Sequence, residues 1–264
     1  MEELMDRVKK IAMQEGVSEY KVFTSEIQRI FIEEFFRTRV SRGYVLFGGA
    51  GLKFGYREKR YTNDVDFGCL GDSWSRVNEA LRFFADFTRI LNKRIGYEVH
   101  CKVDDSKTAG YIFVNCPPLG GIVRIEVEFT DFEIMDKPEK IKIGSSIVLV
   151  CTLKEIKANK IAALVCREKI EVRDIYDIFA IEEAPESELI RLKLEKRGKS
   201  FDNLKERLEF IRANIYSLNK SLIQHLREDL GIEEVNTLFS DEKDISLISR
   251  VLRETEGVYP GDKA

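Results

Sequence analysis

Apolar side chains recur at every fourth position in the segment YKVFTSEIQRIFIEEFFRT, residues 20–38. Phe23, Ile27, Phe31 and Phe35 follow this spacing. Because an α-helix turns once in about 3.6 residues, these side chains share one face, and the segment is predicted to form an amphipathic helix.

A second long helix is predicted in SWSRVNEALRFFADFTRILNK, residues 73–93. Asp72 or Ser73 is the expected N-cap, because a short polar side chain accepts hydrogen bonds from the first backbone N–H groups of a helix. The helix is expected to end near Gly96.

Short apolar and alternating runs predict strands around these helices. The predicted strands cover residues 44–47, 64–68, 97–103, 110–116 and 122–129. The turn PPLGG separates the last two strands as in a hairpin. In the last strand apolar residues alternate with charged ones, so one side is apolar and the other is charged at every position.

The strand signals stop after the apolar run SIVLVC, residues 146–151. A helix is predicted directly afterwards over residues 152–168, and helical patterns dominate the rest of the chain. The fold class is therefore predicted to be α/β or α+β. We expect a mixed domain in residues 1–150 and a helical domain in residues 151–264.

The composition is typical of a globular protein with a heavily charged surface. The 264 residues are 44% apolar and 34% charged, with a formal net charge of −3, so no global attraction to nucleic acid or membrane follows. No apolar run approaches the roughly 20 residues needed to cross a bilayer. The N-terminal segment lacks the apolar stretch of a secretion signal.

The cysteine and histidine content excludes several kinds of site. Five cysteines are an odd number and include no CxxC pair, so we expect a reducing, cytoplasmic location and no disulfide framework or zinc ribbon. His100 and His225 are the only histidines, which argues against histidine-rich metal centres and His-based triads. Both histidines are expected to be structural, and the phenylalanines to belong to the core.

The segment GGAGLKFGYREKRYTNDVDFG, residues 48–68, combines features that suit a nucleotide site. Asp64 and Asp66 point to the same face of a strand, and two such carboxylates repel each other unless a cation lies between them. Mg²⁺ prefers these oxygen ligands together with substrate phosphates. The upstream glycines allow backbone N–H groups to approach a phosphate closely. The combination predicts metal-assisted phosphoryl or nucleotidyl transfer.

Two other phosphate motifs do not match this segment. A P-loop requires GxxxxGK[ST], but Lys53 follows Leu52 and precedes Phe54. A dinucleotide fingerprint requires GxGxxG and a single ribose-binding acid, whereas the glycines here are one residue too far apart and the acids form a pair.

The pattern GG-x-x-L followed by R-x-[S/T]-x-D-[I/V]-D-[F/L] resembles the nucleotidyltransferase core of the AbiEii toxin family. The residues that match are Gly48, Gly49, Leu52, Arg60, Thr62, Asp64 and Asp66. A second block resembles the family's K-x-x-A-L helix and R-D-x-Y-D segment, at residues 160–164 and 173–177. The chain departs from the family at Ala50, where a threonine is common. The resemblance implies a polymerase-beta-like mixed sheet followed by a helical part.

The resemblance also implies roles for these residues. Gly48, Gly49, Arg60, Thr62 and Lys160 are expected to bind the nucleotide, Lys160 through its β- and γ-phosphates. Asp64, Asp66 and Glu126 are expected to hold two Mg²⁺ ions, and Asp174 to orient Lys160 or to act on the acceptor hydroxyl.

Structural alternatives stay open for several of these residues. Glu128 shares the charged face of Glu126, and the preferred interpretation of Glu128 is a solvated acid on an edge strand. Lys160 lies in an apolar helical stripe, so it either reaches outward to solvent or points into a site. Asp174 and Asp177 are neighbours on the next predicted helix and could instead pair with Arg173 or Arg167.

The function that the resemblance implies is a toxin that moves a nucleoside monophosphate from a nucleoside triphosphate to an acceptor hydroxyl. The expected acceptor is RNA, such as the acceptor end of tRNA, and the expected partner is a separately encoded antitoxin. A small-molecule or protein acceptor is the alternative with the same chemistry. The second alternative is an interaction protein that binds a nucleotide and has no enzymatic activity.

Overall fold

The computed structural model describes residues 2–71, 77–241 and 243–259. The chain divides into two compact units, residues 1–151 and 152–264, and each unit has its own hydrophobic core.

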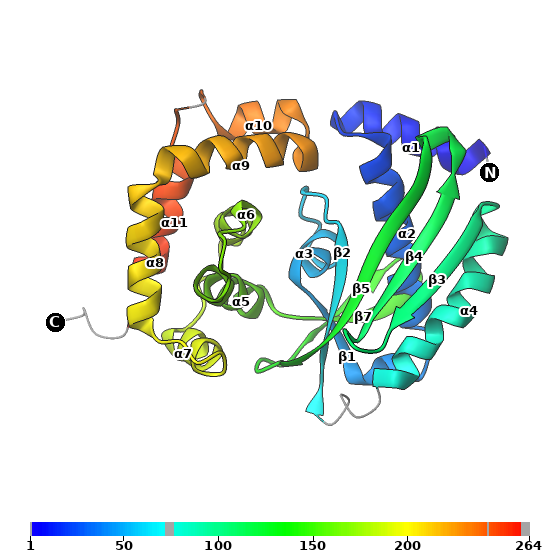
Figure 1. The fold of residues 1–264 in the computed structure, drawn as a ribbon, viewed down its shortest axis with the longest axis horizontal. Coiled ribbons are helices and arrows are strands. Elements are labelled where there is room, and N and C mark those ends of the chain that lie inside the picture. The colour runs from blue at the N-terminus through cyan, green and yellow to red at the C-terminus, as the bar shows by residue number, and fades with distance from the viewer. Residues whose placement is uncertain (1, 72–76, 242, 260–264) are drawn as a thin grey trace. The chain divides into compact units, whose positions relative to one another are not determined.

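Among the described residues, seven strands of the first unit form one mixed sheet in the order β3-β4-β5-β2-β1-β7-β6 (Figure 1). The strands are β1 (Tyr44–Phe47), β2 (Asp64–Cys69), β3 (Glu98–Asp104), β4 (Ala109–Cys116), β5 (Gly121–Glu133), β6 (Glu139–Ile143) and β7 (Ser146–Val150). The pairs β5–β2 and β1–β7 are parallel, and the other neighbours are antiparallel. The predicted fold class and the predicted strands are confirmed.

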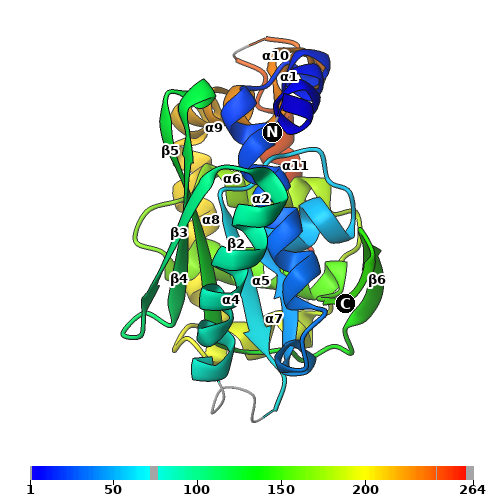
Figure 2. The same ribbon diagram turned by 90° about the vertical axis from the view of Figure 1, so that its right-hand side faces the viewer.

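Helices α2 (Glu19–Phe35) and α4 (Val77–Ile95) pack on one face of this sheet, as Figure 2 shows. The ring of Phe31 in α2 lies 4.9 Å from that of Phe87 in α4 and 6.3 Å from that of Phe67 in β2, measured between centroids. All four members of the predicted apolar stripe of α2 are fully buried. Strand residues alternate between faces, so Asp64 and Asp66, the neighbours of Val65 and Phe67, lie on the face opposite to α2.

The N-cap predicted for α4, Asp72 or Ser73, lies outside the described residues. The other end agrees with the prediction, because Gly96 follows the last helical residue with a φ of +71°. A positive φ is strained for other residues and favours glycine at the end of a helix.

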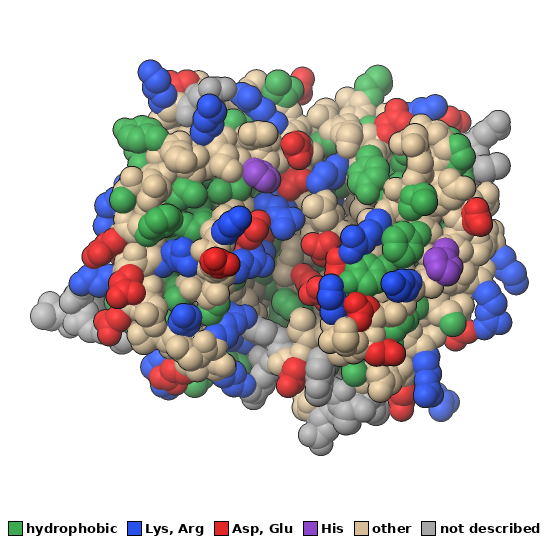
Figure 3. All heavy atoms as spheres, viewed as in Figure 1, with side chains coloured by type: hydrophobic (Ala, Val, Ile, Leu, Met, Phe, Trp, Pro, Cys, Tyr) green, Lys and Arg blue, Asp and Glu red, His purple; other side chains and the backbone are tan. Residues whose placement is uncertain are grey.

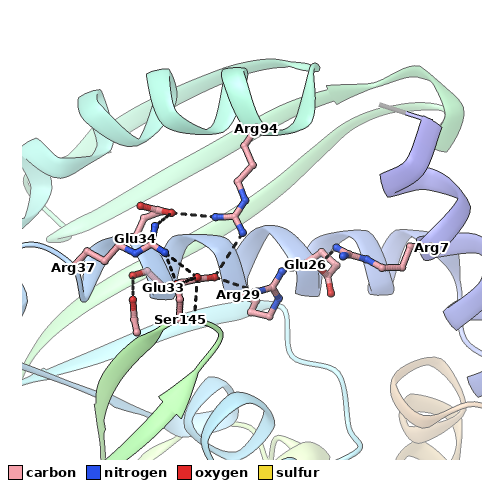
Figure 4. Close-up of polar contacts among 9 residues, drawn as sticks. Arg7, Glu26, Arg29, Glu33, Glu34, Arg37, Arg94 and Ser145 are labelled. Carbon is pink, nitrogen blue, oxygen red and sulfur yellow. Dashed lines mark hydrogen bonds and ion pairs between the residues drawn. The ribbon is translucent and has the colours of Figure 1, made fainter.

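Strand β6 was not predicted from the sequence, and no residue range was predicted for helix α1 (Glu2–Glu15), one of the expected N-terminal helices. The β6–β7 turn is held against α2 by Glu33, whose carboxylate accepts hydrogen bonds from the backbone N–H and the hydroxyl of Ser145 (Figure 4). Burial would raise the pKa of Glu33, but the Ser145 hydrogen bonds and the charges of Arg94 and Arg29 outweigh it and lower that pKa. This cluster fixes the edge of the sheet that sequence analysis missed.

The second unit is helical, as predicted. Its helices are α5 (Leu153–Cys166), α6 (Val172–Ala180), α7 (Ser187–Glu195), α8 (Phe201–Ala213), α9 (Ile215–Leu230), α10 (Ile232–Leu238) and α11 (Ser246–Glu256). Helices α5 and α6 pack against each other, and α7, α8, α9 and α11 pack around them. Within the described ranges, no helix is both long enough and apolar enough to cross a membrane.

Candidate active site

Four carboxylates lie on one face of the first unit's sheet, where β2 and β5 run parallel. Asp64 is paired in register with Glu126, and Asp66 with Glu128. Residues directly opposite each other on neighbouring strands share a face and have closely spaced Cβ atoms, and like charges in such pairs repel. The structure therefore brings the two predicted aspartates together with both candidate glutamates.

The electrostatics of Glu128 show how close these groups are. Its burial, followed by the charges of Glu126 and Asp64, raises the pKa of Glu128 above its usual value. Glu126 also interacts with Tyr111 on β4. A hydrogen bond between the side chains of Tyr111 and Glu126 raises the pKa of the Tyr111 hydroxyl. Glu128 thus interacts electrostatically with Glu126 and Asp64, and Asp66 is its partner in register. These four residues, Asp64, Asp66, Glu126 and Glu128, are defined here as the acidic centre.

The prediction of a solvated edge strand for Glu128 was wrong. Strand β5 lies between β4 and β2 in the sheet, and the Glu128 side chain is half-buried. Arg124, in contrast, is exposed and forms an ion pair with Glu126 at 3.1 Å. Position in the sheet therefore leaves Glu128 as strong a candidate as Glu126 for the third carboxylate.

The glycines beside the acidic centre allow its side chains to approach the backbone. Gly48 has a φ of +64°, and a Cβ there would lie 2.6 Å from Oδ2 of Asp66. A Cβ at Gly49 would lie 2.7 Å from Oγ1 of Thr62 and 3.3 Å from Nη2 of Arg60. A side chain at either position would force these neighbours to move, so the double glycine is required for this packing whether or not a phosphate binds.

The glycine segment is itself helical, and this differs from the predicted turn with a helix after it. Helix α3 (Gly48–Ala50) begins directly after β1 and continues as the π-helix η2 (Gly51–Gly55). π-Helical turns are rare and occur frequently at functional sites. The first backbone N–H groups of a helix have no intrahelical partner, so the segment retains the property that suits a phosphate.

Arg60 and Thr62 lie against this helical segment and are buried. Arg60 is 4% exposed and donates a hydrogen bond to the backbone oxygen of Tyr61 at 3.1 Å. Arg60 is therefore not solvated, whereas Arg57 and Lys59 in the same loop are exposed. Thr62 donates a hydrogen bond to the backbone oxygen of Asp64 at 3.4 Å, which ties the loop to the start of β2.

Gly48→Ala is expected to lower the free energy of unfolding and to displace the Asp66 carboxylate. The left-handed backbone conformation alone costs about 1–2 kcal/mol for a residue with a Cβ, and the contact with Oδ2 adds to this cost. Gly16→Ala is the matched control, because Gly16 has a φ of +66° and no neighbouring atom within 4 Å of the position that a methyl group would take. Urea unfolding of both variants measures the difference, and equal losses would contradict the close contact.

The donor chemistry of the acidic centre fits Mg²⁺, which binds hard oxygen ligands. In the part of the chain that the structure describes, no three His, Cys, Asp or Glu side chains are grouped closely enough to hold a metal ion as they stand. The four carboxylates share one face of the sheet, so rotations of these side chains toward one another would be needed to bind an ion.

The predicted residues of the second unit form a separate cluster of buried charges. Nζ of Lys160 in α5 lies 2.8 Å from Oδ1 of Asp174 and 2.7 Å from Oδ2 of Asp177 in α6. Both aspartates are almost fully buried. Arg167 also pairs with Asp174, at 2.5 Å, as one structural alternative predicted, whereas Arg173 faces Glu171 at 3.9 Å.

The prediction that the phenylalanines belong to the core is wrong for Phe210, which is 51% exposed. Phe113 is half-buried and His100 is exposed, and they lie opposite each other on β4 and β3. The alternation of GYIFVNC places Phe113 on the same side as Tyr111. The register that pairs Tyr111 with Glu126 and Phe113 with His100 depends on strand neighbours that a single sequence does not reveal.

Comparison with known proteins identifies the family. The profile of the nucleotidyl transferase AbiEii toxin family, of type IV toxin–antitoxin systems, matches residues 31–244. No curated protein matches the sequence.

Two solved structures share the fold. One is MenT4, a nucleotidyltransferase toxin from Mycobacterium tuberculosis, with a TM-score of 0.60 and 16% identity over 98% of this chain and 90% of that one. The other is JHP933 from Helicobacter pylori, with a TM-score of 0.51 and 18% identity over 92% and 94% of the two chains. The family match extends over most of the sequence and includes the acidic centre, the glycine segment and the Lys160 cluster. The chain therefore belongs to the AbiEii family of nucleotidyltransferase toxins.

Proposed function

We propose that this nucleotidyltransferase is Mg²⁺-dependent and transfers a nucleoside monophosphate from a nucleoside triphosphate to a hydroxyl of RNA, at the acceptor end of tRNA. The observation that carries the proposal is the register of β2 and β5. It pairs Asp64 with Glu126 and Asp66 with Glu128, on one face and beside the helical glycine segment.

The role of the acidic centre in this proposal is to hold cations where phosphate oxygens react. Asp64 and Asp66 are the proposed ligands, with Glu126 as the third and Glu128 as the alternative for that position. Bound Mg²⁺ would neutralise the developing charge on the pyrophosphate leaving group and assist loss of the proton from the acceptor hydroxyl. The repulsion within the acidic centre favours cation binding, because a cation removes the cost of keeping several carboxylates together.

The proposed role of the glycine segment is to bind the triphosphate. Gly48 and Gly49 are buried and begin helix α3, whose first backbone N–H groups have no intrahelical partner, and the guanidinium of Arg60 lies next to Gly49. A planar guanidinium donates paired hydrogen bonds to phosphate oxygens. Thr62 contributes a hydroxyl at the same place.

In the second unit, Lys160 is the proposed ligand of the β- and γ-phosphates, as the family pattern implies. Its ammonium is held by two buried carboxylates, which fix its position and maintain its positive charge. Asp174 is therefore proposed as a positioning residue for Lys160, and Asp177 has the same geometry.

The proposed partners follow from the family and the chemistry. A toxin of a type IV toxin–antitoxin system is expected to have a protein antitoxin. Nucleoside triphosphates and tRNA are cytoplasmic, so the proposal includes a cytoplasmic location.

The test is an incubation of the purified protein with Mg²⁺, total tRNA and each of the four α-labelled nucleoside triphosphates in turn. We expect label in RNA from one nucleotide, and none when a chelator removes the metal. A labelled small molecule that separates from the nucleoside triphosphate and its hydrolysis products on chromatography would indicate a small-molecule acceptor, and label in protein would indicate a protein acceptor. Absence of transfer to any acceptor, in a protein that binds no triphosphate, would contradict the proposal.

A further inference from the structure

An aromatic and basic surface continues from the acidic centre across β5, β4 and β3. Residues that alternate away from the helices α2 and α4 share this face of the sheet. In register, Tyr111 lies between Glu126 and Lys102, and Phe113 lies between Arg124 and His100. The next row is Asn115, between Glu98 and Ile122, and Ile122 is 67% exposed. Figure 3 shows hydrophobic, basic and acidic side chains side by side over these strands.

The aromatic rings on this face of β3 and β4 lie side by side. The Phe113 and His100 centroids are 6.3 Å apart with an interplanar angle of 28°. The Tyr111 and Phe113 centroids are 6.4 Å apart with an angle of 34°. Phe113 is half-buried and His100 beside it is exposed, whereas Tyr111 is 7% exposed and lies beneath the guanidinium of Arg124. RNA-binding sheets use such a platform of aromatic side chains to stack bases.

Arg124 adds a cation at the centre of this platform. Its guanidinium lies 4.7 Å from the centroid of the Tyr111 ring and pairs with Glu126 at 3.1 Å. The exposed guanidinium plane is itself a surface for stacking of a base, and its charge attracts phosphate. Lys102, across from Tyr111, is exposed and adds a second positive charge.

We propose that this surface, defined as the stacking platform of His100, Phe113 and Arg124 with the buried Tyr111 beneath Arg124, binds unpaired nucleotides of the acceptor RNA. The proposal rests on the nucleotidyltransferase function proposed above and names the part of the protein that receives the acceptor. Bases of the RNA stack on Phe113 and on the guanidinium of Arg124, and the end of the RNA reaches the acidic centre.

The distances on the sheet are consistent with an RNA that runs from Phe113 to the acidic centre. Neighbouring strands are about 4.8 Å apart, and two residues along a strand span roughly 7 Å. Phe113 is two residues from Tyr111, and Tyr111 is paired directly with Glu126. A base on Phe113 is therefore within about one nucleotide of the carboxylates. Duplex RNA is recognised through its backbone and minor groove and offers no exposed base faces to such a platform.

The test is the binding of a short fluorescein-labelled single-stranded RNA, measured by anisotropy without metal or nucleoside triphosphate. Phe113→Leu is expected to weaken binding about 5- to 150-fold, since stacking of one base on an aromatic ring contributes about 1–3 kcal/mol. Phe210→Leu is the matched control, because Phe210 is 51% exposed and has the guanidinium of Arg207 at 5.9 Å from its ring. The control is expected to bind like the wild type.

The same RNA annealed to its complement provides the comparison with duplex, for which Phe113→Leu is expected to change little. His100→Ala is the second variant, because His100 is exposed and its loss leaves the core intact. Thermal unfolding of each variant shows whether it is folded.

Because binding is measured without chemistry, the two proposals fail in different ways. RNA binding that depends on Phe113, in a protein that transfers no nucleotide to RNA, supports the platform and contradicts the proposed function. Wild-type affinity of folded Phe113→Leu and His100→Ala for single-stranded RNA would overturn the platform, even if transfer to RNA is observed.

Discussion

Asp66→Asn is expected to reduce nucleotidyl transfer by about 10³-fold or more while leaving the first unit folded. Asn has nearly the shape of Asp, so the close approach to Gly48 is preserved. What the substitution removes is one negative charge of the acidic centre, on which cation binding depends. Asp66 is paired with Glu128, whose pKa is already raised by burial and by the charges of Glu126 and Asp64. Loss of a further neighbouring charge is therefore expected to leave the stability unchanged or slightly increased.

Two measurements check this expectation. Transfer assays give the loss of activity, and the rise of the unfolding temperature with Mg²⁺ gives the loss of metal binding without any chemistry. Asp105→Asn is the matched control, since Asp105 is an exposed acid of the same unit outside the acidic centre. Transfer by Asp66→Asn at the rate of this control would contradict the proposed mechanism.

The same assays distinguish Glu126 from Glu128 as the third carboxylate. Glu126→Gln and Glu128→Gln each keep the side-chain length and remove one charge. The variant with a loss comparable to that of Asp66→Asn identifies the ligand.

Lys160→Met is expected to lower the free energy of unfolding of the second unit by about 3–5 kcal/mol, because it removes the cation from a buried charge cluster. Asp177 is 0% exposed and loses the ammonium that lies 2.7 Å from its carboxylate. Asp174 also forms an ion pair with Arg167, which remains in the variant. Urea unfolding followed by circular dichroism measures this loss in the free energy of unfolding.

The double variant Lys160→Met/Asp177→Asn separates stability from function. Removing the charge of Asp177 together with that of Lys160 is expected to restore most of the lost stability but none of the transfer activity. If Lys160→Met unfolded with the same urea midpoint as the wild type, the structural role of Lys160 in the buried charge cluster would be contradicted. A folded double variant with full activity would contradict the role in phosphate binding. Without this comparison, an inactive Lys160 variant would not distinguish loss of a ligand from loss of the fold.

Much of the secondary structure was predictable because the apolar pattern is regular. The stripe on α2 and the alternation on β5 each have one period throughout, and both elements have the predicted type. Strand β6, EKIKI, was missed because it is an edge strand with mostly polar residues and only Ile143 fully buried. A single sequence contains little information about such a strand, since its partner provides most of its stability.

The residues of the candidate site could be predicted from the sequence, but their arrangement in space could not. Spacing alone placed Asp64 and Asp66 on one face. The strand order, which makes β5 a central strand and pairs Glu128 with Asp66, comes from long-range contacts that no local pattern encodes. The same holds for Lys160: its apolar stripe suggested an unusual environment, but only the packing of α5 on α6 brings both aspartates to it.

The parallel pairing of β2 and β5 also determines when the acidic centre forms during synthesis of the chain. Parallel strands cannot be joined by a tight turn, and here α4 and the β3–β4 hairpin lie between them in sequence. Contacts between distant parts of a chain form late, because the intervening segment must first be ordered. Asp64 leaves the ribosome long before Glu126 and Glu128, and β1 gains its second neighbour only with β7. A nascent or truncated chain that ends before β5 therefore has neither the acidic centre nor the stacking platform, so toxicity is expected to require synthesis at least through β5.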